Sequence, residues 1–160
     1  MGFCYERVYD GTKIKNVTEI VKEKTMKYYN RHHAALNRAV SGFEGKIMFF
    51  DLHSFEEELL MPGVKTRELP DICLGCNSGF HEKIMQTAVS AFEYFGYKVS
   101  VNYPFSGSLV PNIVLNGANA DICSLMIEVN KPLYLDGRGG VIGETVENVR
   151  RVIRCICSIV

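Results

Sequence analysis

Residues 51–54, Asp-Leu-His-Ser, are the stretch of this chain whose residue types most clearly suit chemistry. An apolar run at residues 47–50 leads directly into them, a pattern typical of a buried strand that ends in polar side chains. Open α/β sheets bind their ligands just beyond the carboxyl ends of such strands. Because an imidazole can bind a metal or move a proton near neutral pH, His53 is the first candidate for a functional residue.

Glu128 is the second candidate, since it interrupts an otherwise apolar run at residues 125–129. Burying a carboxylate without a partner costs several kcal/mol, so its presence there indicates a metal, a base or a substrate beside it. Asn102 and Asn130 also follow predicted strands. In a parallel sheet these polar strand ends would gather at one rim together with His53.

Zinc-dependent hydrolysis is one chemistry that these residues allow. A catalytic zinc needs three protein ligands and an open position for water, and a carboxylate must take the proton of that water. His53 suits a ligand and Glu128 suits the base. Glu56 lies three residues after His53 and is a further candidate ligand, although it also begins a solvated acidic run at residues 56–58.

Three other motifs offer competing interpretations. Ser106 could act as a covalent nucleophile, but it lacks the Gly-x-Ser-x-Gly context of a nucleophile elbow. The glycine-rich residues 137–140 suit either an anion at a helix start or a plain connection. Cys73 and Cys76 have the spacing of a metal or redox pair, yet no second pair completes a zinc site, and cysteines as small buried apolar residues are the commoner case.

Length, composition and charge limit the function classes. The chain has 160 residues, nearly half of them apolar, and a formal net charge of zero, which predicts one globular domain over residues 1–160. The absence of a basic run argues against a nucleic-acid partner, and no apolar run reaches the length of a membrane span. The start lacks the pattern of a signal peptide, so we expect a cytoplasmic location.

Apolar periodicity and turn signals predict helices and strands in the order α-β-β-α-β-β-α. The helices are expected at about 16–40, 79–95 and 143–159, and the strands at 46–52, 72–76, 97–101 and 125–129. Asn16 and Glu19 match a capping box, and an apolar stripe along the first helix is predicted to face the core. Helices between strands favour an α/β fold, a three-layer α/β/α sandwich around a mixed, mostly parallel sheet.

Four segments resemble, in order and spacing, the N-formylglutamate amidohydrolase family. They are 51–54 (Asp-Leu-His-Ser), 70–75 (Pro-Asp-Ile-Cys-Leu-Gly), 96–107 (Gly-Tyr-Lys-Val-Ser-Val-Asn-Tyr-Pro-Phe-Ser-Gly) and 126–136 (Met-Ile-Glu-Val-Asn-Lys-Pro-Leu-Tyr-Leu-Asp). The resemblance runs over nearly the whole chain, and its last segment is specific. It implies a phosphorylase/hydrolase-like fold similar to zinc exopeptidases, and hydrolysis of N-formylglutamate to formate and glutamate at the end of histidine degradation.

The resemblance also implies roles for individual residues. His53 matches the last zinc ligand, and Glu128 matches the carboxylate that activates water. The family usually has Asn-Arg where this chain has Asn130 and Lys131, a place suited to a substrate carboxylate. The implied cofactor is zinc, and the implied substrate is a small acidic N-acyl amino acid. The substrate-binding residues implied in this way are Asn102, Ser106, Gly107, Asn130 and Lys131.

The chain departs from the family pattern in one respect that matters for function. The family's first two zinc ligands lie in an N-terminal portion, a Pro-His-Ser-Gly strand end followed by an acidic residue, which does not occur here. We therefore expect an N-terminally truncated domain whose open sheet edge accepts a complementing chain or a second copy. Two hypotheses follow: a zinc amidohydrolase completed by Glu56 and another histidine or by a second polypeptide, or a catalytically inactive remnant or subunit that binds an acidic ligand or a partner chain.

Overall fold

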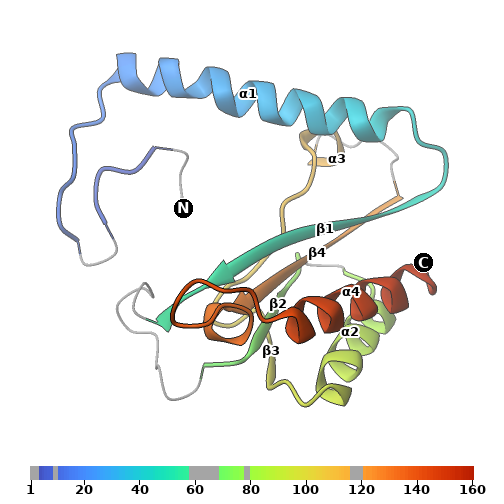
Figure 1. The fold of residues 1–160 in the computed structure, drawn as a ribbon. Coiled ribbons are helices and arrows are strands. Elements are labelled where there is room, and N and C mark those ends of the chain that lie inside the picture. The colour runs from blue at the N-terminus through green and yellow to red at the C-terminus, as the bar shows by residue number, and fades with distance from the viewer. Residues whose placement is uncertain (1–3, 9–10, 58–68, 78–79, 116–120) are drawn as a thin grey trace.

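The structure is a computed structural model that describes residues 4–8, 11–57, 69–77, 80–115 and 121–160. Its helices and strands alternate along the chain much as the periodicity predicts (Figure 1). In order they are α1 (Glu19–Ser41), β1 (Lys46–Phe55), β2 (Ile72–Gly75), α2 (Glu82–Tyr94), β3 (Val99–Val101), α3 (Asn112–Leu115), β4 (Asp121–Asn130), a 3-10 turn η3 (Lys131–Leu133) and α4 (Gly143–Cys157). Within those ranges no helix is both long and apolar enough to cross a membrane.

The four strands form one mixed sheet in the order β1-β4-β2-β3. β1 runs parallel to β4, and β2 runs parallel to β3, but β2 and β4 are antiparallel. The expectation that all polar strand ends gather at one rim is therefore wrong for Asn102. β3 runs opposite to β4, and Asn102 follows β3 at the level of Gly75 and Met126. It therefore lies beside the middle of the sheet and not beside Asn130, the last residue of β4.

One face of the sheet carries the apolar core. Alternate side chains of β2 and β4, including Leu74, Leu125 and Ile127, are fully buried there against α2 and α4. α4 presents Val152 and Ile156 to this core at helical spacing, and α2 presents Phe92. Figure 1 shows α2 and α4 side by side against the sheet. The sheet and these two helices therefore form a two-layer arrangement of the α/β class.

The first helix differs from its sequence prediction in two ways. Its N-cap is Thr18, whose hydroxyl accepts a hydrogen bond from the Val21 amide, and not Asn16, because the helix begins only at Glu19. The predicted apolar stripe does not face the described core: Ile20 and Tyr28 are 64% and 76% exposed. α1 lies apart from the sheet and is connected to it chiefly through α3 (Figure 1), so a third layer that packs on the sheet is not seen among the described residues.

Candidate functional site

The second face of the sheet carries the polar candidates. His53 on β1 lies opposite Glu128 on β4 in the parallel register, and Cys73 on β2 lies opposite Glu128 on its other side. Directly opposed residues of paired strands share a face, and residues two apart in one strand do so as well. Asp51 therefore joins His53 and Glu128 on this polar face. The pairing of His53 with Glu128 across the sheet, predicted from two distant segments, is confirmed by the register.

Asp51 holds the imidazole of His53. Its Oδ1 lies 2.7 Å from Nε2 of His53, while its Oδ2 accepts a hydrogen bond of 3.0 Å from the backbone amide of Leu109. The His53 side chain is about half exposed, whereas that of Asp51 is largely covered. One carboxylate therefore connects the candidate histidine to the loop that crosses this face.

Glu128 is the buried acid of the site. It is 8% exposed, and its Oε2 has no hydrogen-bond partner among the described residues. Burial raises the pKa of Glu128 above its ordinary value; the nearby His53 lowers the pKa, and the negative charge of Asp51 raises it. A carboxyl group with a raised pKa holds a proton more tightly than an ordinary carboxyl group, a property that general acid–base catalysts use.

The loop at residues 102–111 lies directly on this face because β2 ends in a glycine. A Cβ atom on Gly75 would lie 2.3 Å from the carbonyl oxygen of Gly107 and 2.4 Å from Cε of Met126, so only glycine permits this approach. The loop is further attached at Ser124, whose hydroxyl donates to the Leu109 carbonyl at 2.6 Å. Cys73 donates its thiol hydrogen to the Phe105 carbonyl at 3.3 Å, and burial raises the pKa of this thiol, which keeps it protonated.

Asn102 organises the loop from within. Its φ of 56° places it in the left-handed region, where asparagine is one of the few tolerated residues. Its Oδ1 accepts hydrogen bonds from the amides of Cys76 and Gly107 at 3.0 and 3.2 Å. Ser106 is exposed on the same loop, between Asn102 and Gly107. Substrate binding by Asn102, Ser106 and Gly107 stays a prediction, but the structure shows a conformational role for the first and last of them.

The end of β4 leads into the predicted carboxylate-binding residues. Oδ1 of Asn130 is buried and has no hydrogen-bond partner in the part of the chain that the structure describes. Nζ of Lys131 forms an ion pair with Glu56, and this hydrogen bond raises the pKa of Lys131. The Lys131 side chain is about one third exposed, so it is reachable from solvent. Lys131 therefore binds a carboxylate already, which is the chemistry predicted for it, although its partner is Glu56.

The described residues do not by themselves fit a catalytic zinc. No three His, Cys, Asp or Glu side chains among them gather closely enough to hold a metal ion. Glu56 is bound to Lys131, and His53 is bound to Asp51. Oε2 of Glu128 has no hydrogen-bond partner within the described ranges, so nothing in them satisfies this oxygen of the buried acid. His53 thus remains one predicted ligand without described companions.

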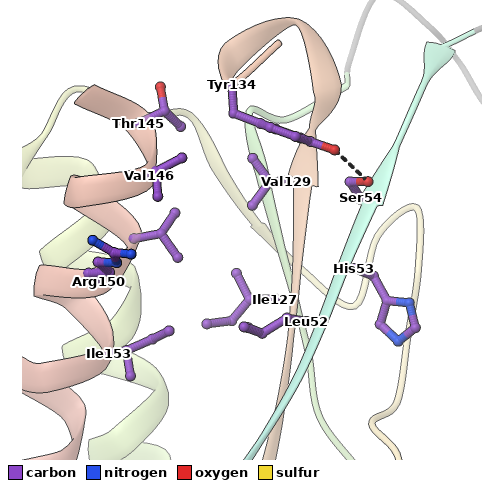
Figure 2. Close-up of a pocket in the computed structure, with 11 residues that line it drawn as sticks. Leu52, His53, Ser54, Ile127, Val129, Tyr134, Thr145, Val146, Arg150 and Ile153 are labelled. Carbon is purple, nitrogen blue, oxygen red and sulfur yellow. Dashed lines mark hydrogen bonds between the residues drawn. The ribbon is translucent and has the colours of Figure 1, made fainter. Parts of the chain in front are cut away.

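A pocket of about 410 Å³ lies on the other face, between β1, β4 and α4. Figure 2 shows its apolar lining, with Leu52 and Val129 from the strands and Val146 and Ile153 from α4. His53 borders the pocket, but its ring points to the opposite side of β1 (Figure 2). The pocket is therefore separate from the polar face that carries Glu128.

The remaining sequence motifs have plain structural roles. Residues 137–140 form a turn in which Asp136 accepts hydrogen bonds from the amides of Arg138 and Gly140, which supports the connection interpretation. Cys73 and Cys123 are buried as expected, whereas Cys155 and Cys157 are exposed. Asp51 was missed as a functional candidate by the sequence reasoning. Its place two residues before His53, on the same side of a strand, is the signal that could have found it.

A family model described as N-formylglutamate amidohydrolase matches residues 1–135. No curated protein matches. A solved structure described as N-formylglutamate amidohydrolase from Ralstonia eutropha JMP134 matches with 26% sequence identity and a TM-score of 0.63. The match covers 92% of this chain and 56% of that chain, so this chain spans little more than half the length of the solved relative.

Proposed function

Because this chain belongs to the N-formylglutamate amidohydrolase family, we propose that its polar sheet face takes part in hydrolysis of N-formyl-L-glutamate or a related N-acyl amino acid. The products are formate and glutamate. The observation that carries the proposal is Glu128, a buried acid directly opposite His53 in the register, one of whose oxygens has no partner among the residues that the structure describes. A location in the cytoplasm and a place in histidine degradation belong to the same proposal.

Glu128 is the proposed general base and acid of this reaction. Its carboxylate takes a proton from the attacking water as the oxygen adds to the formyl carbon, and passes a proton to the nitrogen as the C–N bond breaks. Proton transfer of this kind contributes about 10²- to 10⁴-fold to rates. Burial suits the group to both roles because it raises the pKa towards the working pH.

Asn130 and Lys131 are the proposed carboxylate-binding residues. Asn130 ends β4 two residues after Glu128, and Lys131 begins η3. A substrate whose amide lies at Glu128 therefore has its acidic groups within reach of both. To bind a substrate carboxylate, Lys131 must exchange Glu56 for it. A lysine provides one point charge where an arginine would grip a carboxylate with two parallel bonds.

Zinc dependence requires ligands beyond those that the described residues supply. A bound zinc would polarise the formyl carbonyl, and His53 would be one of its ligands. The other two would have to come from residues outside the described ranges or from another polypeptide. We therefore propose an incomplete zinc site in this chain and assign to its own residues only the proton transfer and the carboxylate binding.

Formate release is the direct test of this function. Purified protein, with and without added zinc, should be incubated with N-formyl-L-glutamate and the formate measured with formate dehydrogenase. Activity that is lost in both Glu128→Gln and His53→Gln supports the proposal. Absence of formate release together with a zinc content near zero would contradict catalysis by the chain alone, and the second hypothesis would then take its place.

That second hypothesis is a subunit that binds another polypeptide, and the open edge of the sheet favours it. Among the described residues β1 pairs only with β4, and Leu52 on this edge strand is 56% exposed beside the apolar pocket. An edge strand next to exposed apolar side chains is a template for a further strand. Self-association would appear as a dimeric mass in light scattering that Leu52→Lys reduces and Tyr94→Lys, on the exposed side of α2, does not. A monomeric mass at every concentration would contradict self-association.

A further inference from the structure

The hydrogen bonds of Asp51 define the protonation pattern of His53. Asp51 has two oxygens, and each has one N–H partner: Nε2 of His53 at 2.7 Å and the Leu109 amide at 3.0 Å. An ionised carboxylate can only accept hydrogen bonds. Nε2 must therefore carry the hydrogen, which leaves Nδ1 of the neutral imidazole with the lone pair.

We infer that Asp51 is the positioning residue of the site: it holds His53 as the Nε2–H tautomer and so leaves Nδ1 as the nitrogen that can accept a proton. The tautomer itself does not depend on the proposed function; only the role of Nδ1 in the reaction rests on it. A carboxylate that accepts from the second nitrogen of a functional histidine fixes both the tautomer and the orientation of the ring. Asp51 is suited to this task because its side chain is mostly covered and attached to the loop at Leu109.

The replacement of Asp51 by asparagine should reverse the tautomer. Asparagine has one acceptor oxygen and one donor amide group in place of two acceptors. The Leu109 backbone amide is always a donor, so the new oxygen turns towards it and the new NH₂ group faces Nε2. Nε2 must then accept, and the hydrogen of His53 moves to Nδ1. The nitrogen that the site needs is thereby blocked, while the loop keeps its attachment.

Nitrogen NMR of the metal-free protein tests this inference without any activity. The chain has four histidines, so a long-range proton–nitrogen spectrum at alkaline pH is simple to assign with His53→Gln as reference. We expect the Nε2–H pattern for His53 in the natural protein and the Nδ1–H pattern in Asp51→Asn. Should Asp51→Asn not fold, Asp51→Ala is the second variant, in which loss of the acceptor should give a mixture of both tautomers.

Ser124→Ala is the matched control. It removes the other attachment of the same loop residue, the hydrogen bond to the Leu109 carbonyl, without touching His53. It should keep the Nε2–H pattern. The inference is overturned if Asp51→Asn keeps that pattern, if Asp51→Ala shows the single tautomer of the natural protein, or if Ser124→Ala changes the tautomer as Asp51→Asn does.

Activity gives a second readout that separates this inference from the proposed function. If the chain releases formate, Asp51→Asn should lower kcat about 10- to 100-fold with little change in KM, the usual range for a residue that orients a metal-binding histidine. A tautomer that reverses in a protein without activity would support the role of Asp51 and refute the proposed function. If the natural protein is active and Asp51→Asn keeps the tautomer unchanged, the proposed function is supported and the role of Asp51 is refuted.

Discussion

The buried acid Glu128 should cost the protein stability, and its removal should therefore stabilise the fold. Glu128 is 8% exposed, and its Oε2 has no hydrogen-bond partner among the described residues. In Glu128→Gln the side chain keeps its shape but carries no charge. The same substitution should abolish any hydrolysis in which Glu128 moves the proton. Gain of stability with loss of activity is the signature of a functional site that is strained for its task.

The size of the effect follows from the ionisation of one group. A buried polar group without a partner costs about 1–3 kcal/mol, and more when it is charged. A glutamine keeps the cost of the uncharged polar group, so the substitution gains only the part that is due to the charge. We expect Glu128→Gln to gain about 1–2 kcal/mol at pH 8, which for a chain of this size raises Tm by about 2–8 °C.

The sign of the pH dependence is fixed by the direction of the pKa shift. Burial raises the pKa of Glu128 in the folded state above the ordinary value of 4.5. The folded state therefore binds its proton more tightly than the unfolded state does, and ionisation destabilises the fold. The gain from Glu128→Gln should be complete above the raised pKa, shrink as the pH falls through it, and vanish below about pH 4, where the carboxyl is protonated in both states.

Urea unfolding followed by circular dichroism measures this gain, in a buffer that contains a chelator so that no metal contributes. Glu23→Gln, an exposed glutamate of α1, is the matched control and should change the free energy of unfolding by less than about 0.5 kcal/mol at any pH. Two results would refute the reasoning from burial. In one, Glu128→Gln is less stable than the natural protein at pH 8. In the other, the gain in stability is the same at pH 4 as at pH 8.

Further predictions concern the residues around Glu128. Lys131→Met should raise KM for N-formyl-L-glutamate about tenfold with little change in kcat, because a charge-assisted hydrogen bond to the substrate is worth about 1.5–3 kcal/mol before solvent screening. Glu56→Gln should lower KM, since it removes the carboxylate that competes for Lys131; a higher KM would contradict this role. Gly75→Ala should destabilise the fold by about 1–3 kcal/mol in urea unfolding because its Cβ would overlap the Gly107 carbonyl. Gly42→Ala is its control, since a Cβ there meets no atom within 4 Å, and equal losses in both variants would contradict the close approach of the loop.

Much of the secondary structure could be predicted because the spacing of apolar residues along a short segment indicates whether that segment forms a helix or a strand. The strand at Ile72–Gly75 and the helices at Glu82–Tyr94 and Gly143–Cys157 lie close to where apolar runs and helical spacing predict them. The strand Asp121–Asn130 includes the predicted residues 125–129 but begins four residues earlier. The family and the candidates Glu128 and His53 could be named as well, since motif order survives in the linear sequence.

Strand direction could not be predicted in the same way. The antiparallel pairing of β2 with β4 depends on which edges meet in space, and the sequence of neither strand encodes it alone. This pairing moves Asn102 away from the end of β4 and leaves the loop, and not the strand end, to cover the site. The apolar stripe of α1 was predicted correctly as a pattern but wrongly as a contact, because periodicity shows that a face is apolar and not what covers it.

The sequence by itself determined which residues have the chemistry for this site, the imidazole of His53 and the carboxylate in an apolar strand at Glu128. Only the tertiary structure decided that they are opposed across β1 and β4, that Oε2 of Glu128 has no hydrogen-bond partner in the described part of the chain, and that Asp51 is attached to the loop at Leu109. The physical reason is that the register and the hydrogen bond to Leu109 join segments more than fifty residues apart, and their energies exist only once the sheet has formed.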